Sequence, residues 1–128
     1  MTDLRISDAA RMLGVSDDTV RRWIDGGRLV AGAGSGPRTV DATSVAALMA
    51  EQAVDRPAPV PTSARNRFAG IVTRVERDGV MALVEIQSGP HRVVSLMSRE
   101  AADELRLEPG VRAAASIKAT NVVVELDR

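Results

Sequence analysis

The sequence contains no cysteine and a single histidine, His91. Without cysteine the chain can form no disulfide bond, thiolate nucleophile or cysteine-ligated zinc finger. One histidine argues against a histidine-based metal site and a Ser-His-Asp triad, and we expect His91 itself at the surface, beside a turn. The chain also offers no nucleophile paired with a base and no metal-ligand spacing, so we expect a protein that is not an enzyme.

Aromatic residues make up only 2% of the chain, whereas hydrophobic residues make up 45%. The core must therefore consist of aliphatic side chains, and the chain lacks the stacking platforms that single-stranded nucleic acid requires. No stretch approaches the ~20 apolar residues needed to cross a bilayer, and the N-terminus has no apolar run of the signal-peptide kind. We expect a cytoplasmic protein without membrane association.

The chain has no excess charge of either sign, because 17 basic residues balance 17 acidic ones. No global field can therefore hold it on DNA. Any DNA binding must come from a local basic cluster that is used more than once.

Three prolines within residues 57–61 indicate a semi-extended spacer. Apolar residues recur at helical spacing before it and alternate as in strands after it. We predict one domain over residues 1–53, a linker over 54–64 and a second domain over 65–128. Each domain is close to the lower size limit for independent folding, so each is expected to need a partner.

The first half reads as a helix-turn-helix followed by a wing. Ser7 is expected to cap a helix over residues 8–13, and Ser16 a second helix over 17–25. Only three residues separate the two, which forces them to cross. A glycine-rich hairpin follows around residues 32–37, and Asp41 is expected to cap a last helix that ends near Gln52.

The second of these helices turns short polar and basic side chains outward, while Val20, Trp23 and Ile24 are spent on packing. Such side chains reach base edges and phosphates in the major groove. The bland alternative is a helix pair that serves only as scaffold. The predicted DNA-contacting residues are Ser16, Asp18, Thr19, Arg21, Arg22, Arg28 and Arg38.

In the second half, apolar and polar residues alternate as they do in β-strands. We predict strands over residues 68–76, 80–87, 91–97, 111–118 and 121–126, with a helix over 99–105 that Ser98 caps. This order is typical of a five-stranded, partly open OB-like β-barrel. The fold class is therefore α+β: an N-terminal winged helix-turn-helix and a C-terminal barrel.

Cations and hydroxyls near the first and last strands of this barrel segment suggest an oxyanion site. A small dianion needs converging cations, hydroxyl groups and backbone N–H donors, without acceptors facing it. Arg65, Lys118, Ser63 and Thr120 can supply the first two kinds of group, and the helix start at Ser98 can supply the third. Each residue taken alone has an ordinary reading as a solvated charge or a helix cap.

Residues 6–29 resemble the MerR-like or excisionase-type winged helix-turn-helix. The resemblance rests on the Gly-Val-Ser turn at 14–16, Thr-Val-Arg-Arg-Trp at 19–23 and Gly-Arg-Leu at 27–29. It implies a recognition helix over 16–25 in the major groove and a wing on the DNA backbone. The wing departs from the pattern, because Arg38 is its one cation.

Residues 62–126 resemble the molybdate-binding Mop family of TOBE domains, the molbindins, most clearly at Ser63-Ala64-Arg65-Asn66 and at residues 105–110 and 117–120. The resemblance implies a molybdate or tungstate site between subunits, with the 63–66 stretch from one chain and the Ser98 and Lys118 regions from another. Ala101 and Ala119 stand where the family often has hydroxyls. The predicted oxyanion-binding residues are Ser63, Arg65, Asn66, Ser98, Ala101, Lys118, Ala119 and Thr120.

Together the two halves resemble the molybdate-responsive transcription regulators, which implies double-stranded operator DNA as a partner. Those regulators commonly carry a tandem pair of barrels, so the partner barrel must here come from another subunit. A dimer is the expected minimum, and the resemblance to free-standing molbindins also allows a hexameric ring of barrels. Two alternatives stay open: a molybdate storage or homeostasis protein, and a regulator whose barrel serves only for oligomerisation.

Overall fold

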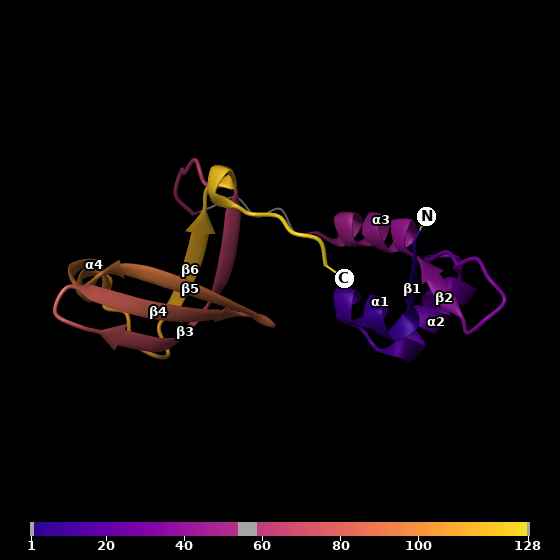
Figure 1. Cartoon of the computed structure of the whole chain (residues 1–128), viewed down its shortest axis with the longest axis horizontal. Helices are drawn as coiled ribbons and strands as arrows, with labels where there is room; N and C mark the ends of the chain where they lie inside the picture. The colour runs from indigo at the N-terminus through magenta and orange to yellow at the C-terminus, as the bar shows by residue number, and fades with distance from the viewer. Residues whose placement is uncertain (1, 54–58, 128) are drawn as a thin grey trace. The chain divides into compact units, whose positions relative to one another are not determined.

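The computed structural model describes residues 2–53 and 59–127. The chain divides into two compact units, Met1–Arg56 and Pro57–Arg128, and each is described by itself (Figure 1). Part of the predicted linker, residues 54–58, lies outside the described residues. The exact domain boundaries therefore stay a prediction. No helix of the described ranges is both long and apolar enough to span a lipid bilayer.

The first unit is a three-helix domain with a small sheet. It contains β1 (Asp3–Arg5), α1 (Ile6–Leu13), α2 (Asp17–Asp25), β2 (Thr39–Asp41) and α3 (Ala42–Gln52). Strands β1 and β2 are antiparallel. Backbone hydrogen bonds from Gly32 N to Thr39 O and from Asp41 N to Val30 O close the wing at its base. The helix-turn-helix prediction is confirmed.

The turn between α1 and α2 follows from its residues. Gly14 adopts a left-handed conformation, with φ of 70°, and its N–H closes the last turn of α1. The side chain of Ser16 accepts a hydrogen bond from Thr19 N at 3.1 Å and so caps α2. Val20 and Ile24 of α2 are buried in one apolar cluster with residues of α1 and α3. Local capping and this shared core fix the crossing of the helices.

The predicted cap of α1 is wrong. The helix starts at Ile6, and Arg5, which precedes it, makes no capping hydrogen bond with its side chain. Strand β1, which was not predicted, runs directly into the helix. Ile6 is 6% exposed, so the burial of this residue, two residues before the expected helix start, sets where the helix begins.

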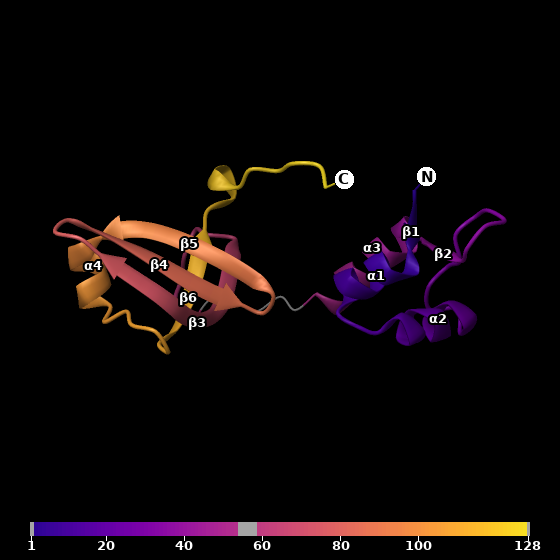
Figure 2. The same cartoon turned by 60° about the horizontal axis from the view of Figure 1, so that its bottom comes forward.

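The second unit is a curled antiparallel sheet with one short helix (Figure 2). Its elements are β3 (Asn66–Arg77), β4 (Met81–Ser88), β5 (His91–Ser98), α4 (Arg99–Glu104), β6 (Arg112–Ile117) and a 3₁₀ turn, η1 (Ala119–Asn121). The strand order is β5-β4-β3-β6. The long strand β3 pairs with β6 through its first half and with β4 through its second half.

The curl requires a glycine in β3. A Cβ atom on Gly70 would lie 2.0 Å from the carbonyl oxygen of Gln87, so no larger residue fits while the strands stay this close. The register between β3 and β4 also shifts between Val72 and Arg74, which bends the strand further. The concave side encloses a small aliphatic core that includes Val72, Ala82 and Val84.

The predicted fifth strand over residues 121–126 is absent, and this half is a four-stranded half-barrel. After β6 the chain enters η1 and leaves the sheet, and residues 122–127 form no strand (Figure 1). Val123 is 91% exposed and Val124 86%. A strand needs a partner edge, and within one chain the turn at η1 directs this segment away from both free edges, β5 and β6.

Helix α4 is fastened to the sheet by Arg77. Its Nε donates a hydrogen bond to Asp103 Oδ1 at 2.9 Å, and its Nη2 donates one to the carbonyl oxygen of Leu107 at 2.8 Å. Its Nη1 lies 3.2 Å from Glu108 Oε1. The Arg77 side chain is only 20% exposed, so these contacts hold the end of α4 and the following loop on the barrel. Ala102 and Leu107 are buried beneath them.

Candidate DNA-contacting helix and oxyanion site

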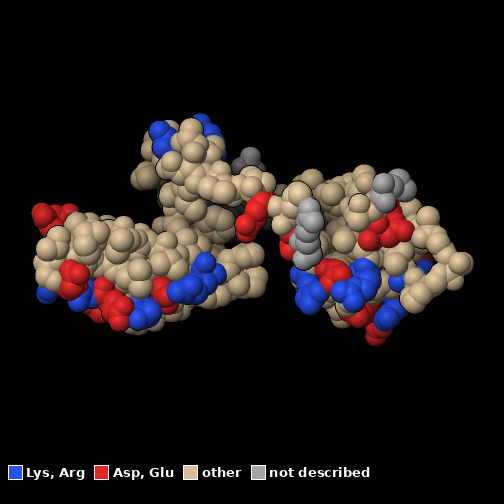
Figure 3. Space-filling view, viewed as in Figure 1, with Lys and Arg blue, Asp and Glu red and all other residues tan. Residues whose placement is uncertain are grey.

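Helix α2 presents the side chains that the sequence predicted. Val20 is fully buried, whereas Asp18, Arg21 and Arg22 are exposed and Thr19 is half-buried. The helix therefore packs one face on the domain and leaves its polar face to solvent. Figure 3 shows basic side chains interspersed with acidic ones on one face of this unit.

Short-range contacts hold the polar side chains of α2 in place. Asp18 accepts a hydrogen bond from Arg21 at 3.1 Å, and the Thr19 hydroxyl accepts one from Arg22 at 3.1 Å. Thr19 also contacts the Ser16 hydroxyl at 2.9 Å. Exposed pairs one helical turn apart are weak. Both arginines can therefore exchange these partners for DNA phosphates or base edges.

The two arginines outside α2 have partners next to it. The guanidinium of Arg28 lies 4.6 Å from the centre of the Trp23 ring, a cation–π contact, and Trp23 packs partly against the core. Arg38, at the end of the wing, donates to Asp25 Oδ1 at 2.5 Å. The structure thus places all four predicted arginines on or beside α2, and their contact with DNA stays a prediction.

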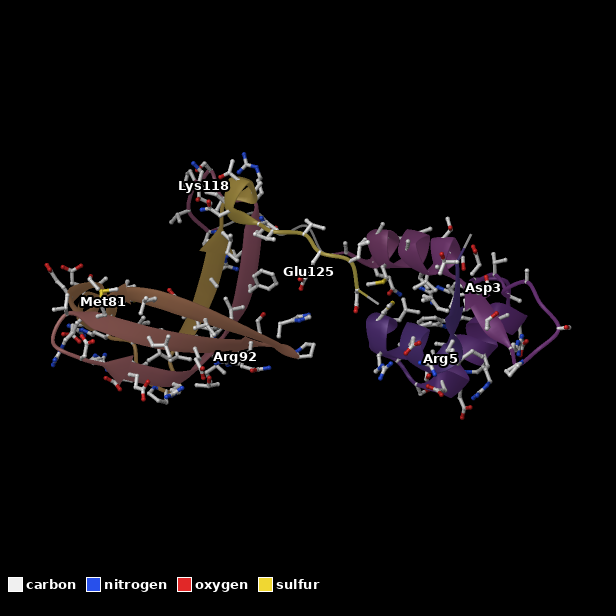
Figure 4. The ribbon with its side chains drawn as sticks, viewed as in Figure 1. Asp3, Arg5, Met81, Arg92, Lys118 and Glu125 are labelled. Carbon is white, nitrogen blue, oxygen red and sulfur yellow. The ribbon has the colours of Figure 1, made fainter. Side chains whose placement is uncertain are left out.

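The start of β3 and the end of β6 lie side by side in the second unit. Asn66 pairs with Ile117 across the ladder, and its Nδ2 donates to the Ile117 carbonyl at 3.1 Å. Arg65 directly precedes β3 and Lys118 directly follows β6, so the two residues flank this last pair. Nη1 of Arg65 donates hydrogen bonds to the carbonyl oxygens of Thr62 and Ala64, both at 3.1 Å. Figure 4 shows Lys118 at this end of the unit.

The 3₁₀ turn adds backbone donors to this end. The first hydrogen bond of η1 runs from Asn121 N to the Lys118 carbonyl at 2.9 Å. The turn itself therefore offers no acceptor to the N–H groups of Ala119 and Thr120. No aspartate or glutamate occurs in residues 62–73 or 110–121. Among the predicted residues, six come together here: Ser63, Arg65, Asn66, Lys118, Ala119 and Thr120.

Ser98 and Ala101 lie at the other end of the unit. Ser98 caps α4 by accepting a hydrogen bond from Ala101 N at 3.1 Å, and it pairs with Met81. Most of the 12 residues of β3 separate this end from Asn66, and Figure 4 shows Met81 and Lys118 far apart within the unit. One chain thus pairs Lys118 with the 63–66 stretch rather than with Ser98. How copies of the chain share the site stays a prediction.

Two arginines that the sequence reasoning missed lie on the same ladder. Arg67 and Arg112 line a hollow of about 670 Å³ whose floor consists of Ala69, Gly70, Ala113 and Ala114. The signal was available, because residues two apart on a strand share a face, which groups Arg67 with Arg65 and Arg112 with Lys118. Among the residues of 2–53 and 59–127, no three acidic or histidine side chains gather as a metal site.

Comparison with known proteins supports the domain type that we predicted for each half. Residues 62–124 match the TOBE domain and residues 4–53 match a helix-turn-helix domain; both are binding modules rather than enzymes. The barrel half is 44% identical over 66 residues to a probable molybdenum-pterin-binding protein of Haemophilus influenzae, which covers 51% of this chain and 96% of that protein.

Two further relatives also match over the barrel half. The molybdenum transport protein ModE of Herbaspirillum seropedicae is 37% identical over 67 residues, which is 52% of this chain but only 25% of that protein. A solved structure of a molybdate binding protein from Sporomusa ovata covers 52% of this chain and all of its own, with a TM-score of 0.51 and 25% identity.

Proposed function

Since this chain belongs to the TOBE domain family through its second half and carries a helix-turn-helix domain in its first, we propose that it is a molybdate-responsive transcription regulator. One observation carries the proposal. Arg65 and Lys118 flank the last pair of the β3–β6 ladder, Asn66 and Ile117, on stretches of chain without acidic residues, in a domain whose relatives are named for molybdenum or molybdate.

The chemistry of this end of the barrel suits a tetrahedral dianion. Two cations neutralise its charge, and the hydroxyls of Ser63 and Thr120 with the open N–H groups of η1 can donate to its oxygens. Molybdate and tungstate have the same charge and shape, so the site should accept both. Ala119 brings no side-chain donor to this end, so binding here depends more heavily on Arg65 and Lys118.

A second copy is expected to complete the barrel. An apolar groove of about 290 Å³ opens on the concave side, lined among others by Val84, Ile86 and Leu107. Residues 122–126 are an unpaired apolar segment, and β5 and β6 are free edges. Burial of this segment along a free edge of another copy would satisfy both surfaces. This supports a dimer as the minimum, and larger rings of barrels would use the same exchange.

The proposed role of the first unit is to bind operator DNA through α2. This unit carries seven acidic residues against six basic ones over residues 1–53, so one copy makes few phosphate contacts. Two copies joined by their barrels would bind a repeated or palindromic operator through avidity. Arg21 and Arg22, held by contacts that are easily exchanged, are the residues expected to contact DNA.

Two experiments test the proposal. Calorimetric titration of the full chain with molybdate, tungstate, sulfate and phosphate should give binding for the first two that exceeds the others at least tenfold. Selection from a random duplex library should enrich a repeated sequence, and Arg21→Ala or Arg22→Ala should weaken its binding by roughly 1–3 kcal/mol without altering molybdate affinity. If the chain bound no molybdate in the titration and enriched no sequence in the selection, the proposal of a molybdate-responsive regulator would be refuted.

Storage or homeostasis of molybdate is the second candidate function. The Haemophilus influenzae relative favours it, because nearly its whole length is matched by the barrel half alone. A storage protein would show the same oxyanion titration but no enrichment in the DNA selection. The two experiments therefore separate the two functions, and a chain that assembles and binds DNA but no oxyanion would leave the barrel as an oligomerisation module.

A further inference from the structure

The cations of the second unit fall into two groups. Four arginines pair with carboxylates of the sheet and α4: Arg74, Arg77, Arg92 and Arg99. The remaining cations of residues 59–127 have no carboxylate of the described residues within 4.0 Å: Arg65, Arg67, Arg106, Arg112 and Lys118. All of these except Arg106 lie on the β3–β6 ladder or at its end.

The register of the ladder puts Arg67 and Arg112 on one face. Arg67 faces Ser116, Ala69 faces Ala114, and Ile71 faces Arg112. Side chains two apart on a strand point the same way, so Arg67 and Arg112 share this face with Ala69 and Ala114, and Arg65 and Lys118 flank the end of the ladder. Arg67 and Arg112 border the hollow of about 670 Å³. The proposed oxyanion site uses the pair at the end and leaves Arg67 and Arg112 without a role.

We propose that the face defined by Arg67, Ala69, Ala114 and Arg112 binds the phosphate backbone of the DNA that α2 contacts. The inference rests on the proposed function and adds a second contact surface to it. Small floor residues leave both guanidinium groups accessible to an elongated anion, and a guanidinium matches phosphate geometry bidentately. Duplex DNA presents such anions at regular intervals.

The charge of this face favours DNA over another copy of the chain. In a symmetric dimer the same patch meets itself, so Arg67 and Arg112 would face cations, at a cost in free energy. The face also stays within reach of a DNA-bound helix-turn-helix. Only residues 53–65 separate the end of α3 from β3, and 13 residues span at most about 45 Å when fully extended.

Salt-dependent binding tests this surface directly. We suggest fluorescence anisotropy of the full chain with a duplex of about 30 bp and arbitrary sequence, at about 50 to 300 mM salt. The slope of log K against log salt is negative, and its magnitude should fall by about 1 in Arg67→Gln and in Arg112→Gln. It should fall by about 2 in the double variant. Arg106→Gln removes an equally unpaired charge outside this face, and its slope should match that of the wild-type protein.

The remaining outcomes separate this inference from the proposed function. Slopes for Arg67→Gln and Arg112→Gln equal to that of Arg106→Gln would overturn the inference, while a reduced slope in Arg21→Ala would still support α2 as the DNA-contacting helix. A change in sedimentation without a change in slope would make the face a protein interface and would also overturn it. Reduced slopes in the barrel variants alone would refute α2 as the DNA-contacting helix, and they would overturn the inference as well, because the face would then bind DNA without α2.

Discussion

Lys118→Met should separate ligand binding from folding. The lysine directly follows β6, and Arg65 directly precedes β3 at the same end of the ladder. No carboxylate of the described residues lies within 4.0 Å of either cation, so no acidic partner within that distance offsets their charge. Methionine keeps much of the length and apolar stem of lysine and removes the charge alone.

The two expected effects differ in sign and in size. Even at a separation of roughly 6 Å, two like charges in water repel by only about 0.7 kcal/mol, and by less once salt screens them. Removing Lys118 should therefore leave the ligand-free protein as stable or slightly more stable. Losing a hydrogen-bonded cation should cost about 2–5 kcal/mol of molybdate binding, roughly 30- to 4,000-fold in affinity.

Calorimetry with molybdate and urea unfolding of the ligand-free chain measure the two effects in the same preparation. Arg106→Gln is the matched control, because it removes a charge from the loop between α4 and β6 that has no carboxylate of the described residues within 4.0 Å. It should leave molybdate affinity unchanged. Undiminished molybdate binding by Lys118→Met, or a loss of more than about 1 kcal/mol of stability without ligand, would refute the site.

Three further variants test the barrel. Gly70→Ala should lower the thermal midpoint and cost about 1–3 kcal/mol or more of unfolding free energy, because a Cβ there would lie 2.0 Å from a backbone oxygen of the facing strand. Gly79→Ala is its control, because a Cβ at that position would have nothing within 4 Å. A hydrogen bond from Arg92 lowers the pKa of Glu85 below its usual 4.5. Unfolding free energy should therefore fall as the pH drops below about 4.5, and Glu85→Gln should flatten that decline in acid titrations; an unchanged decline would contradict it. A chain that ends after Asn121 should sediment as a monomer, and an unchanged oligomer would exclude exchange of the C-terminal segment.

Elements with strong local signals were predictable from the sequence. Ser16 marked the start of α2, because a side-chain cap is decided by neighbouring residues. Asp78-Gly79 marked the β3–β4 turn, where Asp78 accepts hydrogen bonds from the N–H groups of Val80 and Met81 at 2.7 Å. These contacts lie within three residues and need no knowledge of the fold.

Elements decided by distant partners were not predictable. Residues 121–126 have the composition of a strand, but pairing requires an edge that one chain does not bring to them. Strand β1 forms only because β2 returns beside it. Likewise, the sequence grouped Ser98 with Lys118, whereas the length and curl of β3 hold them at opposite ends of the unit.

The central claim is that one chain couples an oxyanion to DNA binding, and a single titration tests it. Anisotropy of the full chain on a library-selected duplex should be measured at low protein concentration with molybdate, with sulfate and with neither. Ligand that stabilises the assembled barrels should strengthen binding, so we predict at least a fivefold gain with molybdate and none with sulfate. Equal affinity under all three conditions would contradict the account.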